Sequence, residues 1–152
     1  MIDRYINIMK NLLICVGLMC SQVIVAQSFD FTYDHYSFVV EDLKTTGDYY
    51  AEVLGLEEIP HPSDTVNFRW FRIQGNTQVH LIRKDVVQKT ENKSVHLCLS
   101  TQDLDRFIAS LEEKDTPYWD WPGKPRAVTT RADGVRQIYL KDPEDNWIEI
   151  NT

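Results

Sequence analysis

Three of the four histidines and one glutamate fall at matched places in two similar halves of the sequence. His35 lies in the stretch YDHYSFVVEDL (residues 33–43), and His96 lies at the same position of the stretch SVHLCLSTQDL (residues 94–104). Each half ends on a short apolar stretch with one polar residue at its centre, His80 in the first half and Glu149 in the second. The chain therefore repeats one unit, in which the same two positions carry a side chain that can bind a metal.

The chemistry of these four side chains is that of a metal site. Imidazole and carboxylate groups suit Zn²⁺, Fe²⁺, Mn²⁺, Ni²⁺ or Co²⁺, and two histidines with one carboxylate leave positions open for a substrate. Any one histidine in an apolar strand is more readily explained as a buried, hydrogen-bonded residue. Their repeat-matched places favour a divalent metal site made by His35, His80, His96 and Glu149. A carboxylate inside an apolar strand is costly unless paired or coordinated, which adds support from Glu149.

The spacing of apolar residues predicts the elements that must position these ligands. The expected strands are residues 31–40, 56–59, 67–73, 77–83, 95–99, 127–131, 135–141 and 146–150, and the expected helices are 44–54 and 103–113. Ser100 and Asp103 resemble a capping box for the second helix. Strand alternation places each ligand on the face opposite the apolar residues, which can pack under a helix.

These elements predict an α+β fold with two tandem βαβββ modules over residues 31–83 and 94–152, joined by the polar linker 84–93. We expect a curved, partly closed eight-stranded sheet with its helices outside and the four ligands on the concave side. The linker is long enough either to complete the site within one chain or to exchange modules across a homodimer. We expect a site within one chain, because exchange must also meet the entropy cost of association.

Composition limits the classes of partner. The chain has 152 residues, 43% hydrophobic and 26% charged, which is ordinary for one globular domain. Its net charge is −7 and no cluster of basic residues is visible, which argues against a nucleic-acid partner. We expect a small-molecule substrate.

Residues 1–26 differ from the rest of the sequence. Lys10 precedes an apolar run over residues 12–20, and the small Ala26 offers a cleavage point. This order predicts a signal peptide, with residues 27–152 as one mature, secreted or periplasmic domain and no stable membrane span after cleavage. A lipid-anchored form through Cys20 and an N-terminal core element are the alternatives.

From about residue 31 to its end, the sequence resembles the vicinal oxygen chelate superfamily, which includes glyoxalase I, extradiol dioxygenases and fosfomycin- and bleomycin-resistance proteins. The similar pieces are Asp34-His35, the helical stretch YYAEVLGL (residues 49–56) and the closing GVRQIYLKDPEDNWIE (residues 134–149). The resemblance implies that His35, His96 and Glu149 bind the metal, and that the fourth ligand position, often a glutamate that also transfers protons, is His80 here. It implies catalytic roles for Glu149 and His80. Asp145 replaces the usual turn glycine.

Two functions are compatible with this resemblance. The first is a metal-dependent lyase, isomerase or dioxygenase acting on a small oxygen-chelating substrate. The second is a protein that binds and sequesters a small molecule, and a site with a purely structural role is a third reading. Glyoxalase I acts on a glutathione adduct, and an exported protein would rarely meet this cytosolic thiol, so a different substrate is expected.

A few further side chains are candidates for a site. Cys98 shares the strand face of His96, and a small buried hydrophobe is its simpler interpretation. The loop over residues 117–125 carries Tyr118, Trp119 and Trp121, which could line a substrate or anchor the loop. The arginines on or near strands could bind a substrate carboxylate, although solvated strand edges explain most of them.

Overall fold

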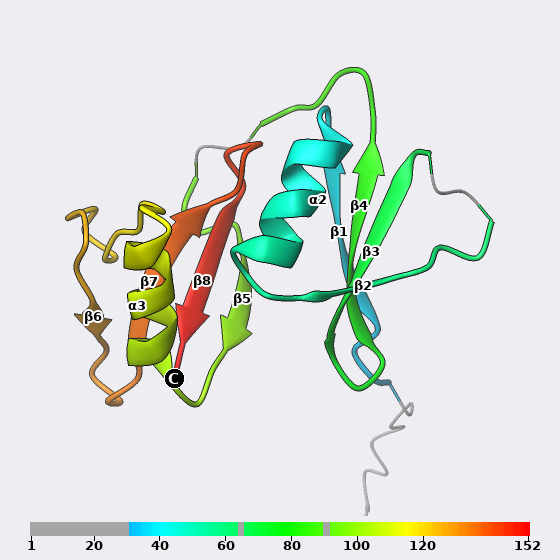
Figure 1. The fold of residues 1–152 in the computed structure, drawn as a ribbon. Coiled ribbons are helices and arrows are strands. Elements are labelled where there is room, and N and C mark those ends of the chain that lie inside the picture. Colours follow the sequence, from blue (N-terminus) through cyan, green and yellow to red (C-terminus); the bar gives the residue numbers. More distant parts are fainter. Residues whose placement is uncertain (1–30, 64–65, 90–91) are drawn as a thin grey trace, which may run out of the picture. The chain divides into compact units, whose positions relative to one another are not determined.

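The structure is a computed structural model that describes residues 31–152 except 64–65 and 90–91, so the predicted signal peptide lies outside the described residues. Contacts group Tyr33–Thr152 into one unit. Its elements follow the predicted order, β-α-β-β-β twice (Figure 1). The first module consists of β1 (His35–Val40), α2 (Leu43–Glu52), β2 (Glu57–Ile59), β3 (Phe68–Gln74) and β4 (Thr77–Arg83). The second consists of β5 (His96–Ser100), α3 (Leu104–Glu113), β6 (Thr129–Thr130), β7 (Arg136–Lys141) and β8 (Trp147–Asn151).

Each module forms its own four-stranded sheet with the same topology. The strand orders are β1-β4-β3-β2 and β5-β8-β7-β6, and in each sheet the first and last strands of the module pair in parallel. The α+β class and the two modules are therefore confirmed. In the described part of the chain, the eight strands form two separately hydrogen-bonded sheets, and β1 and β5 are each an edge strand.

The helices cover one face of each sheet. The predicted ligands lie on the other face, which we call the ligand face. Beneath α2, the apolar face of the first sheet buries Phe38, Val40, Val79 and Leu81. The second sheet and α3 bury the corresponding set, Leu97, Leu104, Leu111, Ile138, Leu140, Ile148 and Ile150. Alternation along each strand then turns His35, His80, His96 and Glu149 to the opposite faces.

The repeated Asp-Leu pair begins both helices. Asp42 and Asp103 are the N-caps, and their carboxylates accept the backbone N–H of Thr45 (2.9 Å) and Arg106 (3.0 Å). The capping box expected from Ser100 is therefore wrong, since the capping side chain is that of Asp103 itself. A cap of this type stabilises a helix by about 1 kcal/mol.

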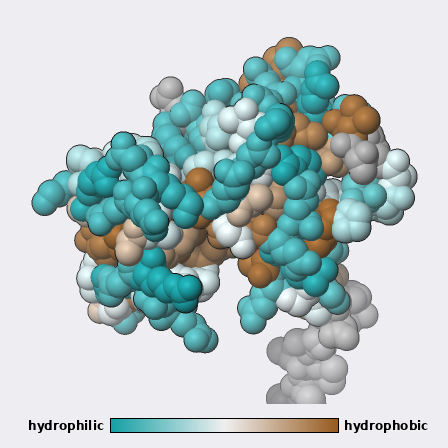
Figure 2. All heavy atoms as spheres, viewed as in Figure 1, coloured by the Kyte–Doolittle hydropathy of each residue, from teal (hydrophilic) through white to brown (hydrophobic). Residues whose placement is uncertain are grey.

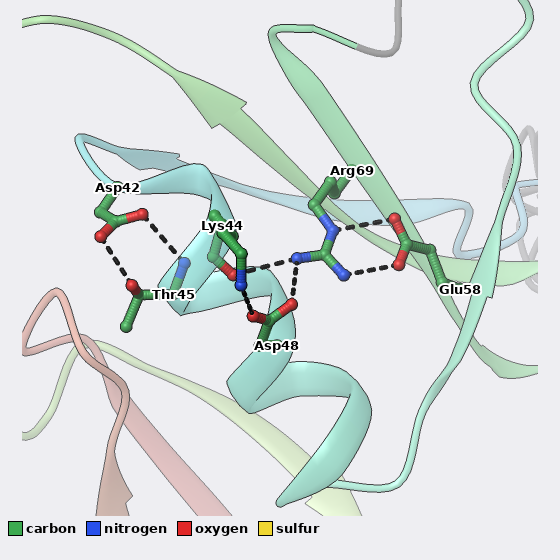
Figure 3. Close-up of polar contacts among 6 residues, drawn as sticks. All are labelled: Asp42, Lys44, Thr45, Asp48, Glu58 and Arg69. Atoms are coloured by element: carbon green, nitrogen blue, oxygen red, sulfur yellow. Dashed lines mark hydrogen bonds and ion pairs between the residues drawn. The ribbon is translucent and has the colours of Figure 1, made fainter.

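Gly47 lies inside α2, where glycine is unfavourable by roughly 1 kcal/mol relative to alanine. The structure explains its presence, because a β-carbon at this position would overlap the guanidinium group of Arg69. Figure 3 shows this guanidinium beside the helix, between Asp48 and Glu58. It is held by Glu58 (2.6 and 2.8 Å), by Asp48 (2.9 Å) and by the carbonyl oxygen of Lys44 (3.0 Å).

The turn between β7 and β8 joins the second module to the first. Glu144, only 5% exposed, accepts the backbone N–H groups of Glu41 (3.0 Å) and Asp42 (2.8 Å). Asp142, also buried, accepts the hydroxyl hydrogen of Tyr50 at 3.3 Å. Burial raises the pKa of Asp142. Two acidic side chains of one turn thus bind the residues that precede α2 and the last turn of the helix.

The visible surface is mostly hydrophilic, with hydrophobic patches among the polar residues (Figure 2). Among the described helices, none is both long enough and apolar enough to cross a membrane. On β1, however, the ligand face is open: His35 and Ser37 are exposed, and Val39 is 41% exposed. Within residues 31–152, as far as the structure describes them, the ligand face of this edge strand is therefore largely exposed.

Candidate metal centre

The first sheet brings His35 and His80 together. Their rings stack with centroids 4.2 Å apart and an interplanar angle of 16°. On the other side of His80, the Trp70 ring stacks at 4.0 Å and 7°, because β3 places Trp70 directly opposite His80. His80 is 9% exposed and lies between the two rings, whereas His35 lies at the open edge of the sheet.

The surroundings of His80 favour its neutral form. Burial, followed by the neighbouring His35, lowers the pKa of His80. Its Nε2 lies 2.8 Å from Oε1 of Gln78. A neutral imidazole is the form that binds a metal. Gln78 must release Nε2 if that nitrogen is the ligand, or else hold Nε2–H and leave Nδ1 for the metal.

The second sheet brings His96 and Glu149 together. Nε2 of His96 lies 3.3 Å from Oε2 of Glu149. Glu149 is 6% exposed, which agrees with the expectation that a carboxylate in this strand needs partners. The register repeats that of the first sheet, since Cys98 lies opposite Glu149 as Ser37 lies opposite His80. The strand pairing therefore agrees with the sequence repeat, which made His80 equivalent to Glu149.

Glu149 is restrained by three further side chains. The hydroxyl of Tyr139 donates to its Oε2 at 2.5 Å, and the amide of Asn151 donates to its Oε1 at 3.0 Å. The Cys98 thiol lies 3.6 Å from Oε1. Burial and the carboxylate raise the pKa of the Tyr139 hydroxyl, so Tyr139 stays a hydrogen-bond donor. These bonds fix the direction in which Glu149 presents its oxygens.

The hydrogen-bond partner of Nδ1 of His96 shows which ring nitrogen carries the proton. Nδ1 lies 2.7 Å from the carbonyl oxygen of Lys93. A carbonyl oxygen can only accept, so Nδ1 carries the proton and donates it. In the neutral ring, Nε2 then holds the lone pair and faces Glu149.

The four predicted ligands thus form two pairs in two sheets. Among the described residues, no three His, Cys, Asp or Glu side chains lie where they could hold one metal ion. The four ligands expected to meet within one chain therefore do not meet in this chain. His35 and His80 lie in the first sheet, and His96 and Glu149 lie in the second.

A cavity of about 410 Å³ opens beside the second pair. His96 and Glu149 line it together with Tyr139, Trp121 and Arg131. Of the aromatic loop, Trp121 is the residue that could meet a substrate, since it is 46% exposed. Tyr118 is buried and donates to Glu112 at 3.0 Å, and Trp119 packs edge-on against Trp147. A larger cavity of about 800 Å³ lies beside the start of α2 and is lined by none of the four predicted ligands.

Two neighbours of the ligands were not expected from the sequence, Trp70 and Tyr139. Each sits directly opposite a ligand across an antiparallel ladder, Trp70 opposite His80 and Tyr139 opposite Glu149. Counting residues outward along both strands from the turn at Asp142 would have placed Tyr139 opposite Glu149.

Cys98 as a residue is exposed, but its thiol is partly buried. This burial and the nearby Glu149 raise the pKa of the thiol to about 11.

The sequence of residues 32–150 matches the model of the Glyoxalase/Bleomycin resistance protein/Dioxygenase superfamily. The chain belongs to this superfamily. It is the vicinal oxygen chelate superfamily that the motifs around His35 and Glu149 indicated.

Individual members of the superfamily are similar over most of the chain. The uncharacterized protein YwbC of Bacillus subtilis is 27% identical over 123 residues, which cover 77% of this chain and 94% of YwbC. A glyoxalase family protein from Bacillus anthracis has a TM-score of 0.68 at 20% identity and covers 82% of this chain and 97% of that one. Lactoylglutathione lyase from Agrobacterium tumefaciens has a TM-score of 0.61 at 17% identity, covering 79% and 92%. At these identities the solved structures share the fold.

Proposed function

We propose that this protein is a metal-dependent enzyme, of the lyase, isomerase or dioxygenase type, that acts on a small oxygen-chelating substrate. The observation that carries the proposal is the equivalent placement of two ligand pairs, His35 with His80 and His96 with Glu149, on the helix-free faces of two like sheets. Superfamily membership supports the same class of chemistry.

The complete site is proposed to form between two copies of the chain. Each copy offers one pair from each module, and neither pair alone supplies the three ligands of an open metal site. The open ligand face of β1 leaves room for a second chain at His35. In a homodimer, the first module of one copy would face the second module of the other, and two equal sites would result.

The donor set fits a divalent ion. Three imidazoles and one carboxylate suit Zn²⁺, Fe²⁺, Mn²⁺, Ni²⁺ or Co²⁺. Burial favours the neutral form of His80, and the bond to Lys93 leaves Nε2 of His96 available. When bound, such an ion supplies a Lewis acid that polarises the oxygens of a chelating substrate.

The chain's own groups orient the ligands and handle protons. Tyr139 and Asn151 hold Glu149 in one direction. Gln78 and the two stacked rings hold His80. Glu149 and His80 are the groups proposed to accept or return a proton, since each lies on the ligand face and has a second hydrogen-bonding atom. Trp121 and Arg131 border the adjoining cavity, where the rest of the substrate would bind.

A second function, the binding and sequestering of a small molecule, is favoured by the rings of the first sheet. Trp70, His80 and His35 stack in sequence, and His61 contacts Trp70 edge-on at 4.5 Å. Such a surface can bind a flat ligand without chemistry. Turnover separates the two functions, because a sequestering protein returns its ligand unchanged.

Export of the protein is a separate proposal, which rests on the leader sequence over residues 1–26. N-terminal sequencing of protein recovered from the producing cells tests it. A mature chain beginning at Gln27 is expected. An intact N-terminus in the cytosolic fraction would contradict export and restore a glutathione adduct as a candidate substrate.

Metal analysis of the purified protein tests the proposed site. We expect about one divalent ion per chain, because two equal sites would be shared by two chains. His35→Ala, His96→Ala and Glu149→Ala should each lose it. His61→Ala is the matched control, because His61 is the histidine outside the ligand set, and it should keep the ion. An ion-free wild type after reloading with each metal, or equal loss in the His61 variant, would refute the proposal.

A further inference from the structure

The ammonium group of Lys93 is enclosed by aromatic rings on the ligand face of the second sheet. Its Nζ lies 4.8 Å from the centre of the Trp147 ring, 5.1 Å from Tyr139 and 5.8 Å from Trp121. It also donates hydrogen bonds to the carbonyl oxygens of Asp120 (3.1 Å) and Trp121 (3.0 Å). Ring faces and carbonyl oxygens both attract a cation, so this side chain is firmly anchored.

The loop that receives Lys93 is itself fixed. The Asp120 carboxylate accepts the backbone N–H of Gly123 at 2.9 Å and closes the loop. Trp119 exchanges two backbone hydrogen bonds, of 2.9 and 2.8 Å, with Tyr139 of β7. Lys93 therefore ties the end of the linker to a segment that is part of the second sheet.

The backbone of Lys93 acts on His96. Its carbonyl oxygen accepts the Nδ1–H of His96 at 2.7 Å, in a tight turn closed by the Val95 N–H and the Asn92 carbonyl at 2.9 Å. The direction of this carbonyl depends on where the turn lies. The turn is fixed on one side by β5 and on the other by the anchored Lys93 side chain.

We propose that Lys93 is a positioning residue for His96. Its side chain, held in the aromatic cage of Trp121, Tyr139 and Trp147, fixes the turn whose carbonyl oxygen keeps the proton on Nδ1. Nε2 then carries the lone pair toward Glu149. The consequence for metal binding rests on the proposed function, whereas the effect on the His96 ring does not. Restraint of a metal-binding histidine through its other nitrogen commonly changes metal affinity by about 10–100-fold.

The test compares three variants of the full chain. Lys93→Met keeps a long flexible side chain but removes the charge and the donors. Lys93→Arg restores a cation that can lie on aromatic rings and donate to carbonyl oxygens. Lys141→Met is the matched control, because Nζ of Lys141 also lies on the Trp147 ring, at 4.9 Å, but bonds to Asp145 rather than to the loop. Nitrogen-15 NMR of the His96 ring in metal-free protein reports which nitrogen carries the proton.

We expect the Nδ1–H form in the wild type, in Lys93→Arg and in Lys141→Met, and a mixture of both forms in Lys93→Met. Metal affinity should fall about 10–100-fold in Lys93→Met alone. Unchanged NMR signals of His96 in a folded Lys93→Met protein would overturn the proposal, as would an equal change in Lys141→Met. A wild type that binds no metal would refute the proposed function, while the NMR result in metal-free protein would still decide the role of Lys93.

Discussion

His35 and His80 stack ring on ring although they are not opposite each other in the β1–β4 ladder. His35 lies opposite Gln78, and His80 lies opposite Ser37, so the contact is diagonal across two strands. His96 and Glu149 have the same diagonal relationship in the second sheet. Each module thus brings two ligands together by the same backbone geometry. The proposed site needs one pair from a first module and one pair from a second module.

Mixing two inactive variants should restore metal binding if the halves come from different copies. His35→Ala and His96→Ala chains, unfolded and refolded together, would form mixed dimers in which one site carries both defects and the other carries none. About a quarter of the sites should then bind metal if the chains pair at random. Metal content is measured after removal of free ions.

The control for this experiment is each variant refolded alone, which should bind nothing. A mixture that also binds nothing, although size measurements show dimers, would mean that both halves of each site come from one chain after rearrangement.

Gly47→Ala should destabilise the protein although alanine favours a helix. The new methyl group would displace the Arg69 guanidinium, which is held by Glu58, Asp48 and Lys44. We expect a loss of about 1–3 kcal/mol in the free energy of unfolding, as for other overpacked sites. Urea denaturation measures it. In an Arg69→Ala background the same change should instead stabilise by up to about 1 kcal/mol. Equal effects in the two backgrounds would disprove the proposed overlap.

Glu144→Ala should weaken the joint between the modules. The change leaves the backbone N–H groups of Glu41 and Asp42 without their carboxylate acceptor. The expected loss in the free energy of unfolding is about 1–3 kcal/mol. Asp145→Asn in the same turn is the control and should cost little, because the ion pairs of Asp145 are exposed and asparagine tolerates its φ of 65°. Similar losses in both variants would count against this role of Glu144.

Cys98 should be a slow nucleophile at pH 8. Burial, together with Glu149, raises the pKa of its thiol to about 11, so the reactive thiolate is scarce until the pH approaches that value. Iodoacetamide labelling of a Cys15→Ser, Cys20→Ser variant should therefore be about 100-fold slower than labelling of an ordinary thiol at pH 8 and should rise as the pH approaches 11.

Glu149→Gln should accelerate this labelling, because it removes the negative charge that disfavours the thiolate. The same variant unfolded in urea gives the reference rate for an unrestrained Cys98. A folded protein labelled at that reference rate at pH 8 would contradict the raised pKa.

Much of the fold was visible in the sequence because its signals are local. Period-2 alternation located the strands, and the Asp-Leu pairs marked the starts of both helices. Equating His35 with His96, and His80 with Glu149, needed only the repeat, and the strand registers confirm it.

What the sequence could not supply depends on contacts between distant segments or on irregular backbone. Counting from the turn at Gly75 places Phe71 opposite His80, but a bulge between Arg72 and Gln74 shifts the ladder and brings Trp70 there instead. The reason for Gly47 lies 22 positions away, at Arg69. The division of the ligands between two ladders depends on which strand edges pair, and the alternation pattern within each strand does not specify that.

The matching registers of the two modules also bear on stereochemistry. A centre made from two such halves would be nearly two-fold symmetric, with imidazoles at three corners and the symmetry broken only where Glu149 stands in the place of His80. A flat substrate bound there would meet a carboxylate on one side and a neutral imidazole on the other. The two faces of the substrate would therefore exchange protons at different rates. A single difference between the repeated modules would then be enough to give a product of one enantiomer.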